Sequence, residues 1–208
     1  MSHEIVDVGQ WPRAHDDQRH PMWWGIMGLI IIESTVLLGF VVSYFYLWIV
    51  NMAEGKAGWP PAGTQLPPLL YPTMDCVLLL FCAYTMWHGG IVMNRGNNRF
   101  FNWLIIACTI ASILVFYFRI KQFMILPFTH NENAYASFVW FLTGFHFFHV
   151  LATLLGTLVI GVLSYKGYFH PKRLLGVKID TFYWYFVVAG WFPVYFIVYL
   201  LPRMVNHE

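Results

Sequence analysis

Five long apolar stretches, separated by polar or proline-rich segments, organise this sequence. They cover residues 23–51, 75–93, 100–118, 137–165 and 181–201. A run of about 20 apolar residues is long enough to cross the hydrocarbon layer of a membrane as a helix. A helix is also suited to that place, because it satisfies its own backbone hydrogen bonds there. The pattern therefore predicts an all-α, polytopic membrane protein, a bundle of five transmembrane helices.

The segments outside these stretches look like an arm and connecting loops. Residues 1–22 form a polar arm, whose layout differs from that of a cleavable signal peptide. Prolines are dense in residues 52–73, which favours a stiff, extended segment over a helix. We expect residues 23–208 to form a single transmembrane domain that follows the N-terminal arm.

The lysines and arginines indicate which side of the membrane each loop faces. If the N-terminus is cytoplasmic, eight of the 12 lie on the cytoplasmic side and four outside. Short loops rich in these residues stay in the cytoplasm. The sequence thus predicts a cytoplasmic arm at residues 1–22 and a C-terminus outside. Arg119 and Lys121 are expected to close the third span, from which their side chains can snorkel to the interface.

Composition agrees with a membrane location and excludes other classes. Hydrophobic residues make up 59% of the chain and charged residues 11%, unlike a soluble domain. The net charge of +2 and the scattered basic residues provide no patch for nucleic acid. Cys76, Cys82 and Cys108 lie in apolar runs, at spacings that match no zinc or redox motif. We expect them to be small core residues.

Glu33 is the one charged residue of the first apolar stretch. At about 1.5 Å per residue it lies roughly 15 Å into the helix, near the middle of the membrane. A charge at that depth costs about 2.5–3.5 kcal/mol, so such a carboxylate needs a partner, a proton or surrounding protein. Glu33 is therefore a candidate functional residue.

His146 and His149 are the second polar feature within the spans. Their spacing puts them on one helix face, and they lie about 14 and 18 Å from the outer end of the fourth span. Since Glu33 lies at a similar depth, we predict a hydrogen bond between Glu33 and His146 or His149. The contact is open to two interpretations, a structural link between two helices or a part of a proton relay.

A metal site is the alternative use of these histidines. His88 on the second span lies within a helical turn of the depth of His149, so a bis-histidine haem between the two spans is conceivable. A membrane dihaem protein would show more such pairs, and di-iron enzymes need many more histidines. We therefore expect no metal bound by this chain.

Several segments resemble one known family. WWGIMGLIIIESTVLLGFVVSYFYL resembles the Glu-bearing helix of subunit III of haem–copper respiratory oxidases, and TGFHFFHV resembles that family's T-G-F-H-x-x-H-V motif. Three further segments resemble other parts of the family. PPLLYPTMDCVLLL resembles its second helix, NAYASFVWFLTGFH the entry to its fourth helix, and YWYFVVAGW its final helix. The five spans are similar to the shorter bacterial form of the family. The family's glutamate and two histidines correspond to Glu33, His146 and His149.

Other positions depart from the family pattern and suggest a divergent branch. Tyr185 and Val188 stand where the final helix usually has histidine and aspartate, and Lys178 stands where a glutamate is usual. Arg119 and Gln122 occupy positions where glutamine and glutamate are typical. These changes affect contacts built on those side chains and leave the fold intact.

The resemblance implies an accessory subunit without haem or copper of its own, in a bacterial inner (plasma) membrane. Haem and copper would lie in subunits I and II of a proton-pumping oxidase, and a larger respiratory supercomplex is a further candidate partner. The chain would support assembly, phospholipid binding, proton uptake and durable turnover. Candidate lipid or interface contacts are Trp23, Trp24, Trp184 and Tyr185. Two alternatives remain: an accessory protein of a nitric oxide reductase, and a small proton-coupled transporter.

Overall fold

The computed structural model describes residues 21–55, 58–171 and 173–205. Its helices are α1 (Pro21–Ala53), α2 (Leu70–Asn94), α3 (Asn98–Met124), α4 (Ala134–Tyr165) and α5 (Leu175–Tyr195). A π-helical turn, η2 (Phe196–Leu200), and α6 (Leu201–Val205) continue α5 without a break. In this part of the chain, five helical segments are long and apolar enough to cross a membrane, with α5, η2 and α6 counted as one. The predicted number of spans is thus confirmed.

Three helix boundaries differ from the predicted ones by five residues or more. α2 begins at Leu70 instead of residue 75, and its first turn contains Pro72. Proline is tolerated there because the first N–H groups of a helix have no partner in the helix. α3 continues to Met124 instead of residue 118, and α5 begins at Leu175 instead of residue 181. Arg119, which was expected at the end of its span, and Lys178, which was expected in a loop, therefore lie within helices.

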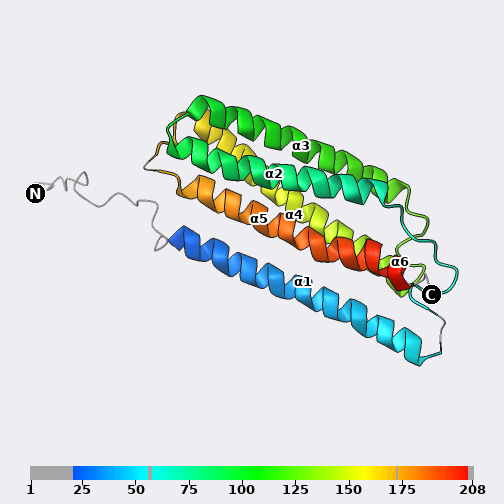
Figure 1. Ribbon diagram of the computed structural model, residues 1–208. Coiled ribbons are helices and arrows are strands. Elements are labelled where there is room, and N and C mark those ends of the chain that lie inside the picture. Colours follow the sequence, from blue (N-terminus) through cyan, green and yellow to red (C-terminus); the bar gives the residue numbers. More distant parts are fainter. Residues whose placement is uncertain (1–20, 56–57, 172, 206–208) are drawn as a thin grey trace, which may run out of the picture.

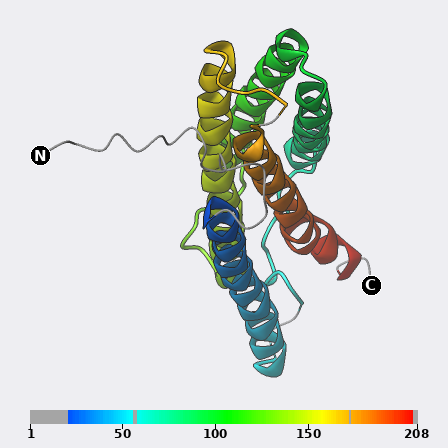
Figure 2. The same cartoon turned by 90° about the vertical axis from the view of Figure 1, so that its left-hand side faces the viewer.

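Helices α2 to α5 pack into one bundle, and α1 lies outside it. α2 and α3 form a hairpin around a short turn in which Gly96 has a φ of 76°. α3 packs against α4, whereas α5 packs against both α2 and α4. α1 lies along α4 and α5 (Figures 1 and 2). Because Tyr44 is the only buried residue of α1, this helix is a peripheral element of the fold.

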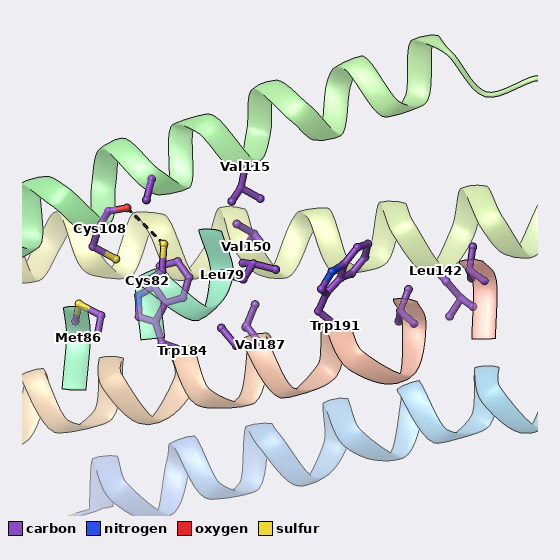
Figure 3. Close-up of a cluster of buried hydrophobic side chains, with 14 of the residues drawn as sticks. Leu79, Cys82, Met86, Cys108, Val115, Leu142, Val150, Trp184, Val187 and Trp191 are labelled. Carbon is purple, nitrogen blue, oxygen red and sulfur yellow. Dashed lines mark hydrogen bonds between the residues drawn. The ribbon is translucent and has the colours of Figure 1, made fainter. Parts of the chain in front are cut away.

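The core of the bundle is built from aliphatic, aromatic and sulfur-containing side chains of α2 to α5. Figure 3 shows how they fill the space between the helices, with Leu79 and Met86 from α2, Val115 from α3, Val150 from α4 and Trp184 from α5. The Cys82 thiol lies 3.8 Å from the carbonyl oxygen of Cys108, and both side chains are buried as free thiols. They are core residues, as the sequence indicated.

The π-helical turn η2 creates the attachment point for the C-terminal half of α1. Pro193, just before it, has no N–H to donate, and a π turn shifts the backbone hydrogen bonds. The hydroxyl of Tyr44 donates to the carbonyl oxygen of Ile197 at 3.1 Å, and that of Tyr135 donates to Val198 at 2.8 Å. Two backbone carbonyl oxygens of η2 thus accept hydrogen bonds from tyrosine hydroxyls of α1 and α4.

Candidate functional site: polar groups inside the helix bundle

Glu33 lies where α1 meets α4 and α5. Its Oε1 atom is 3.5 Å from Nε2 of His149 on α4, and it accepts a hydrogen bond from the Tyr183 hydroxyl on α5 at 3.3 Å. The side chain is 19% exposed, so it lies at the seam between α1 and the bundle. Together, Glu33, His149 and Tyr183 form the Glu33 cluster, which joins three helices through polar contacts.

The hydrogen bonds of His149 define what this contact requires. Its Nδ1 atom lies 2.8 Å from the carbonyl oxygen of Phe145, which can only accept, so Nδ1 carries the hydrogen. In a neutral imidazole, Nε2 then presents only a lone pair to Glu33. Two acceptors cannot form a hydrogen bond without a proton between them. A hydrogen bond across this 3.5 Å contact therefore requires one proton, either on the Glu33 carboxyl or on Nε2 of His149.

His146 has a different place from the one that its spacing suggested. It is buried, and its Nε2 atom lies 3.0 Å from the carbonyl oxygen of Val187 on α5. Its ring packs on Trp191 at 4.7 Å between centroids. Of the two histidines, His149 is the one within reach of Glu33, whereas His146 links α4 to α5 in the bundle.

A second carboxyl group, Asp180, lies inside the bundle and was not singled out from the sequence. Its Oδ2 atom accepts a hydrogen bond from the Thr157 hydroxyl at 2.8 Å, and Thr157 accepts one from Nε1 of Trp184 at 2.8 Å. A side chain at Gly156 would bring a Cβ within 2.8 Å of Asp180 Oδ1. The missing side chain of Gly156 therefore makes room for this carboxyl between α4 and α5.

Trp184 corrects one of the expected lipid or interface contacts. It is completely buried, because its indole N–H is bound to Thr157 and its ring fills the core (Figure 3). Trp24 and Tyr185 are 68% and 38% exposed and remain candidates for such contacts. Trp23 is half-buried and packs on Phe182 at 5.4 Å between ring centroids, so it attaches the start of α1 to α5.

Arg119 also differs from the expectation that it snorkels to the membrane surface. It is fully buried, with Nη2 at 3.0 Å from Oδ2 of Asp75, and its guanidinium lies 3.8 Å above the ring of Trp191. Because α3 continues past it, its side chain turns into the bundle. A signal for Asp75 was present in the sequence, since it lies on the same helix face as Leu79 and Cys82, which are core residues.

An apolar groove of about 560 Å³ runs beside the Glu33 cluster, between α1, α4 and α5. Its walls include Ile26 of α1, Val159 of α4 and Ile179 of α5, and Arg173 of the α4–α5 connection lies on its rim. The Arg173 guanidinium stacks on the ring of Tyr168 at 3.7 Å. The groove thus combines apolar walls with a cationic rim.

The histidines do not frame a common metal site. His88 packs among Tyr84, Trp87 and Phe100, whereas His149 packs against Glu33 and the aromatic rings around it. Within the described residues, no group of three or more His, Cys, Asp or Glu side chains is arranged to hold a metal ion. The geometry offers no support for a haem shared by α2 and α4.

Comparison with known proteins places these features in one family. Residues 4–202 match the sequence model of cytochrome c oxidase subunit III. Cytochrome c oxidase subunit 3 of Synechocystis sp. is 29% identical over 194 residues, which cover 90% of this chain and 80% of that protein. The Marchantia polymorpha protein of the same name is 29% identical over 179 residues, covering 85% and 67%. That of Thermostichus vulcanus is 25% identical over 183 residues, covering 86% and 87%.

These matches confirm the resemblance that the Glu-bearing helix and the T-G-F-H-x-x-H-V segment indicated. The family model spans nearly the whole chain, including four of the five long helical segments in full and the fifth up to residue 202. This chain therefore belongs to the cytochrome c oxidase subunit III family.

Proposed function

We propose that this chain is the redox-centre-free accessory subunit of a haem–copper terminal oxidase, which reduces oxygen to water with electrons from cytochrome c or quinol. The observation that carries the proposal is the family match over residues 4–202. Haem and copper lie in the partner subunits I and II, and this chain supports their assembly and lasting activity. The complex lies in a bacterial inner membrane, with the N-terminus of this chain in the cytoplasm.

A contribution to proton uptake is supported by the Glu33 cluster. The Glu33–His149 contact needs one proton, and that proton has two alternative sites, the carboxyl and Nε2 of the imidazole. The Tyr183 hydroxyl stabilises a charged carboxylate by donating to the same Oε1 atom. A group of this kind can hold a proton close to the membrane midplane and release it to a neighbouring acceptor.

Phospholipid binding is supported by the groove between α1, α4 and α5. Its apolar walls suit an acyl chain, and Arg173 on its rim suits the phosphate of a headgroup. In the proposed orientation, Arg173 lies at the cytoplasmic surface of the membrane. A lipid in this groove would fill the space between α1 and the bundle, where direct side-chain contacts are few.

Purification of the complex tests the proposal directly. We would tag the C-terminus of the chain, solubilise membranes in a mild detergent, and identify the co-purifying proteins and lipids by mass spectrometry. We expect a haem–copper oxidase subunit I to co-purify in an amount nearly equal to that of the tagged chain, and the sample to show the haem spectrum of that subunit. Co-purification of a nitric oxide reductase catalytic subunit would place the chain in that complex instead. A chain that purifies without any haem–copper subunit would contradict the proposal and favour a transporter.

A further inference from the structure

Asp75 and Arg119 form a charged pair that is wholly enclosed by the helix bundle. Their closest atoms are 3.0 Å apart, and neither side chain reaches the surface of the chain. Charged residues are almost never buried to this extent unless they are paired. Exposed pairs contribute little to stability, whereas the removal of one member of a buried pair is costly. The pair therefore calls for a specific role in this fold.

The position of the pair within the α2–α3 hairpin indicates what that role is. Asp75 lies in the second turn of α2, and Arg119 lies near the end of α3. The short turn around Gly96 joins the two helices at their other ends. The turn thus closes one end of the hairpin by covalent linkage, and the ion pair closes the open end. We call Asp75 and Arg119 the charge clasp.

The charge clasp also contacts α5 through Trp191. The Arg119 guanidinium lies 3.8 Å above the Trp191 ring, and the indole N–H of Trp191 donates to the thiol sulfur of Cys76, next to Asp75, at 3.0 Å. One turn along α3, Gln122 donates a hydrogen bond to the hydroxyl of Tyr199 in η2. Trp191 points from α5 into the bundle (Figure 3). The hairpin is therefore fixed to α5 by the same side chains that close it.

Each charge of the clasp depends on the other for its compensation. Apart from the ion pair itself, the guanidinium nitrogens of Arg119 and both carboxylate oxygens of Asp75 have no hydrogen-bond partner among the described residues. Loss of either charge would leave the other buried without its counter-charge. A buried charge without a counter-charge carries a large desolvation penalty, whereas the penalty for two neutral amides that can contact each other is smaller. The cost of removing the charge of Asp75 therefore depends on whether Arg119 is still charged, and the reverse also holds.

We infer that Asp75 and Arg119 act as one neutral unit, which locks the α2–α3 hairpin onto α5. Either charge is indispensable while its partner is present, and both can be lost together. This inference goes beyond the proposed function, because it concerns how the four-helix bundle is held together and is independent of lipid and proton binding. It also predicts that Trp191 and its contact with His146 keep their positions only while the clasp is intact or jointly neutralised.

A double-mutant cycle on the full chain in detergent tests this inference. The variants are Asp75→Asn, Arg119→Gln and the two combined, with unfolding followed during titration with SDS. Each single change should lower the folding equilibrium constant by about 100-fold or more, and the double change should restore it to within about tenfold of wild type. Lys121→Gln is the matched control, since it removes a cation from the same helix outside the pair, and it should change the constant by less than about fivefold.

Two results would overturn the inference. One is a pair of single variants that are as stable as Lys121→Gln. The other is a double variant whose loss equals the product of the two single losses, because this would show no coupling. If a single variant does not accumulate in membranes, the membrane level of the double variant decides: a level near wild type supports the unit, and its absence contradicts it.

Discussion

Glu33 illustrates how single residues make an expensive group tolerable inside a membrane. Its Oε1 atom is shared between the Tyr183 hydroxyl and Nε2 of His149. Since Nδ1 of His149 is already committed to the Phe145 carbonyl, a hydrogen bond between Glu33 and His149 requires one proton between them. A side chain that brings its own hydrogen to this position should therefore keep the contact with His149.

Glu33→Gln should lower the stability of the chain less than Glu33→Ala does. The one Oε1 atom makes both contacts, so an amide keeps one of them in place, because its nitrogen can donate to Nε2 of His149 or its oxygen can accept from Tyr183. Glu33→Ala removes both contacts and should lower the free energy of unfolding by about 1–3 kcal/mol. Unfolding in SDS measures both effects, with Ser34→Ala on the exposed side of α1 as the control.

The same variants test the role of Glu33 in turnover. Oxygen reduction should persist in the assembled Glu33→Gln complex, because the proposed function assigns the chemistry to the partner subunits. Complete loss of oxygen consumption in a fully assembled Glu33→Gln complex would show that the carboxyl supplies an obligatory proton, and that a role limited to joining helices is insufficient.

Arg173→Gln should weaken retention of anionic phospholipid in the purified complex. The guanidinium is the cation on the rim of the α1–α4–α5 groove, and each basic residue near an anionic membrane surface contributes about 1 kcal/mol. Quantitative mass spectrometry of the bound lipids should show a loss of severalfold. Lys166→Gln removes an exposed cation of the same connection away from the groove walls. Equal lipid content in both variants would argue against the assignment of Arg173.

The sequence predicted the positions of some polar residues in the bundle better than those of others. Glu33 could be paired with His146 or His149 because these residues interrupt long apolar runs at similar depths, whereas the choice of His149 needed the structure. Asp75 and Arg119 lie near predicted span ends, where a charged side chain usually reaches the interface, so their inward orientation depends on tertiary contacts. Trp184 was a candidate lipid or interface contact, but its hydrogen bond to Thr157 places it in the core.

Helix α4 approaches its neighbours closely at glycine positions. A Cβ at Gly161 would lie 2.9 Å from a methyl carbon of Ile105 on α3, and one at Gly156 would meet Asp180. A Cβ at Gly144, in contrast, would have no atom within 4 Å. The distance between α3 and α4 is therefore set locally by an absent side chain, a common device in membrane helix packing.

Gly161→Ala should therefore destabilise the chain although alanine favours helices. The added methyl group forces α3 and α4 apart, at a cost of about 1–3 kcal/mol for overpacking. Gly144→Ala on the same helix should be neutral or stabilising by up to about 1 kcal/mol. Unfolding in SDS compares the two variants. Equal stability of both would mean that the helix contact at Gly161 is looser than described.

Helix number could be predicted from apolar runs, whereas three of the helix ends could not. The prolines before residue 75 argued against a helix there, yet a proline in a first turn, such as Pro72, costs no hydrogen bond. Lys178 was assigned to a loop because of its charge, but it lies in the first turns of α5, outside the apolar part of the span. Hydropathy reports the membrane-embedded part of a helix and not its full length.

At the scale of the whole molecule, α1 and the α2–α5 bundle differ in how they are held. The bundle has a continuous core, whereas α1 is attached at Trp23, Glu33 and Tyr44. These contacts, together with the packing of Phe40 on Phe141 and Phe145, leave much of the surface of α1 exposed within this chain. The exposed surface of α1 is thus available to lipid or to partner subunits.

Cysteine labelling tests the proposed orientation in the membrane. Ala62 lies in the connection between α1 and α2, and Lys166 lies in the one between α4 and α5, and both are exposed. In intact cells, an impermeant thiol reagent should label Ala62→Cys. Lys166→Cys should be labelled only after the membrane is opened, because the Lys/Arg-rich connections stay in the cytoplasm. The reverse pattern would invert the topology.

Removal of this chain from the purified oxidase tests the central claim most directly. An accessory subunit without redox centres predicts that the depleted complex keeps its full haem and copper content and its initial rate of oxygen consumption. Its activity should then decline within fewer turnovers than that of the intact complex, and should be protected when the chain is added back. Loss of haem or copper together with the chain, or an immediate and complete loss of oxygen reduction on depletion, would contradict the account.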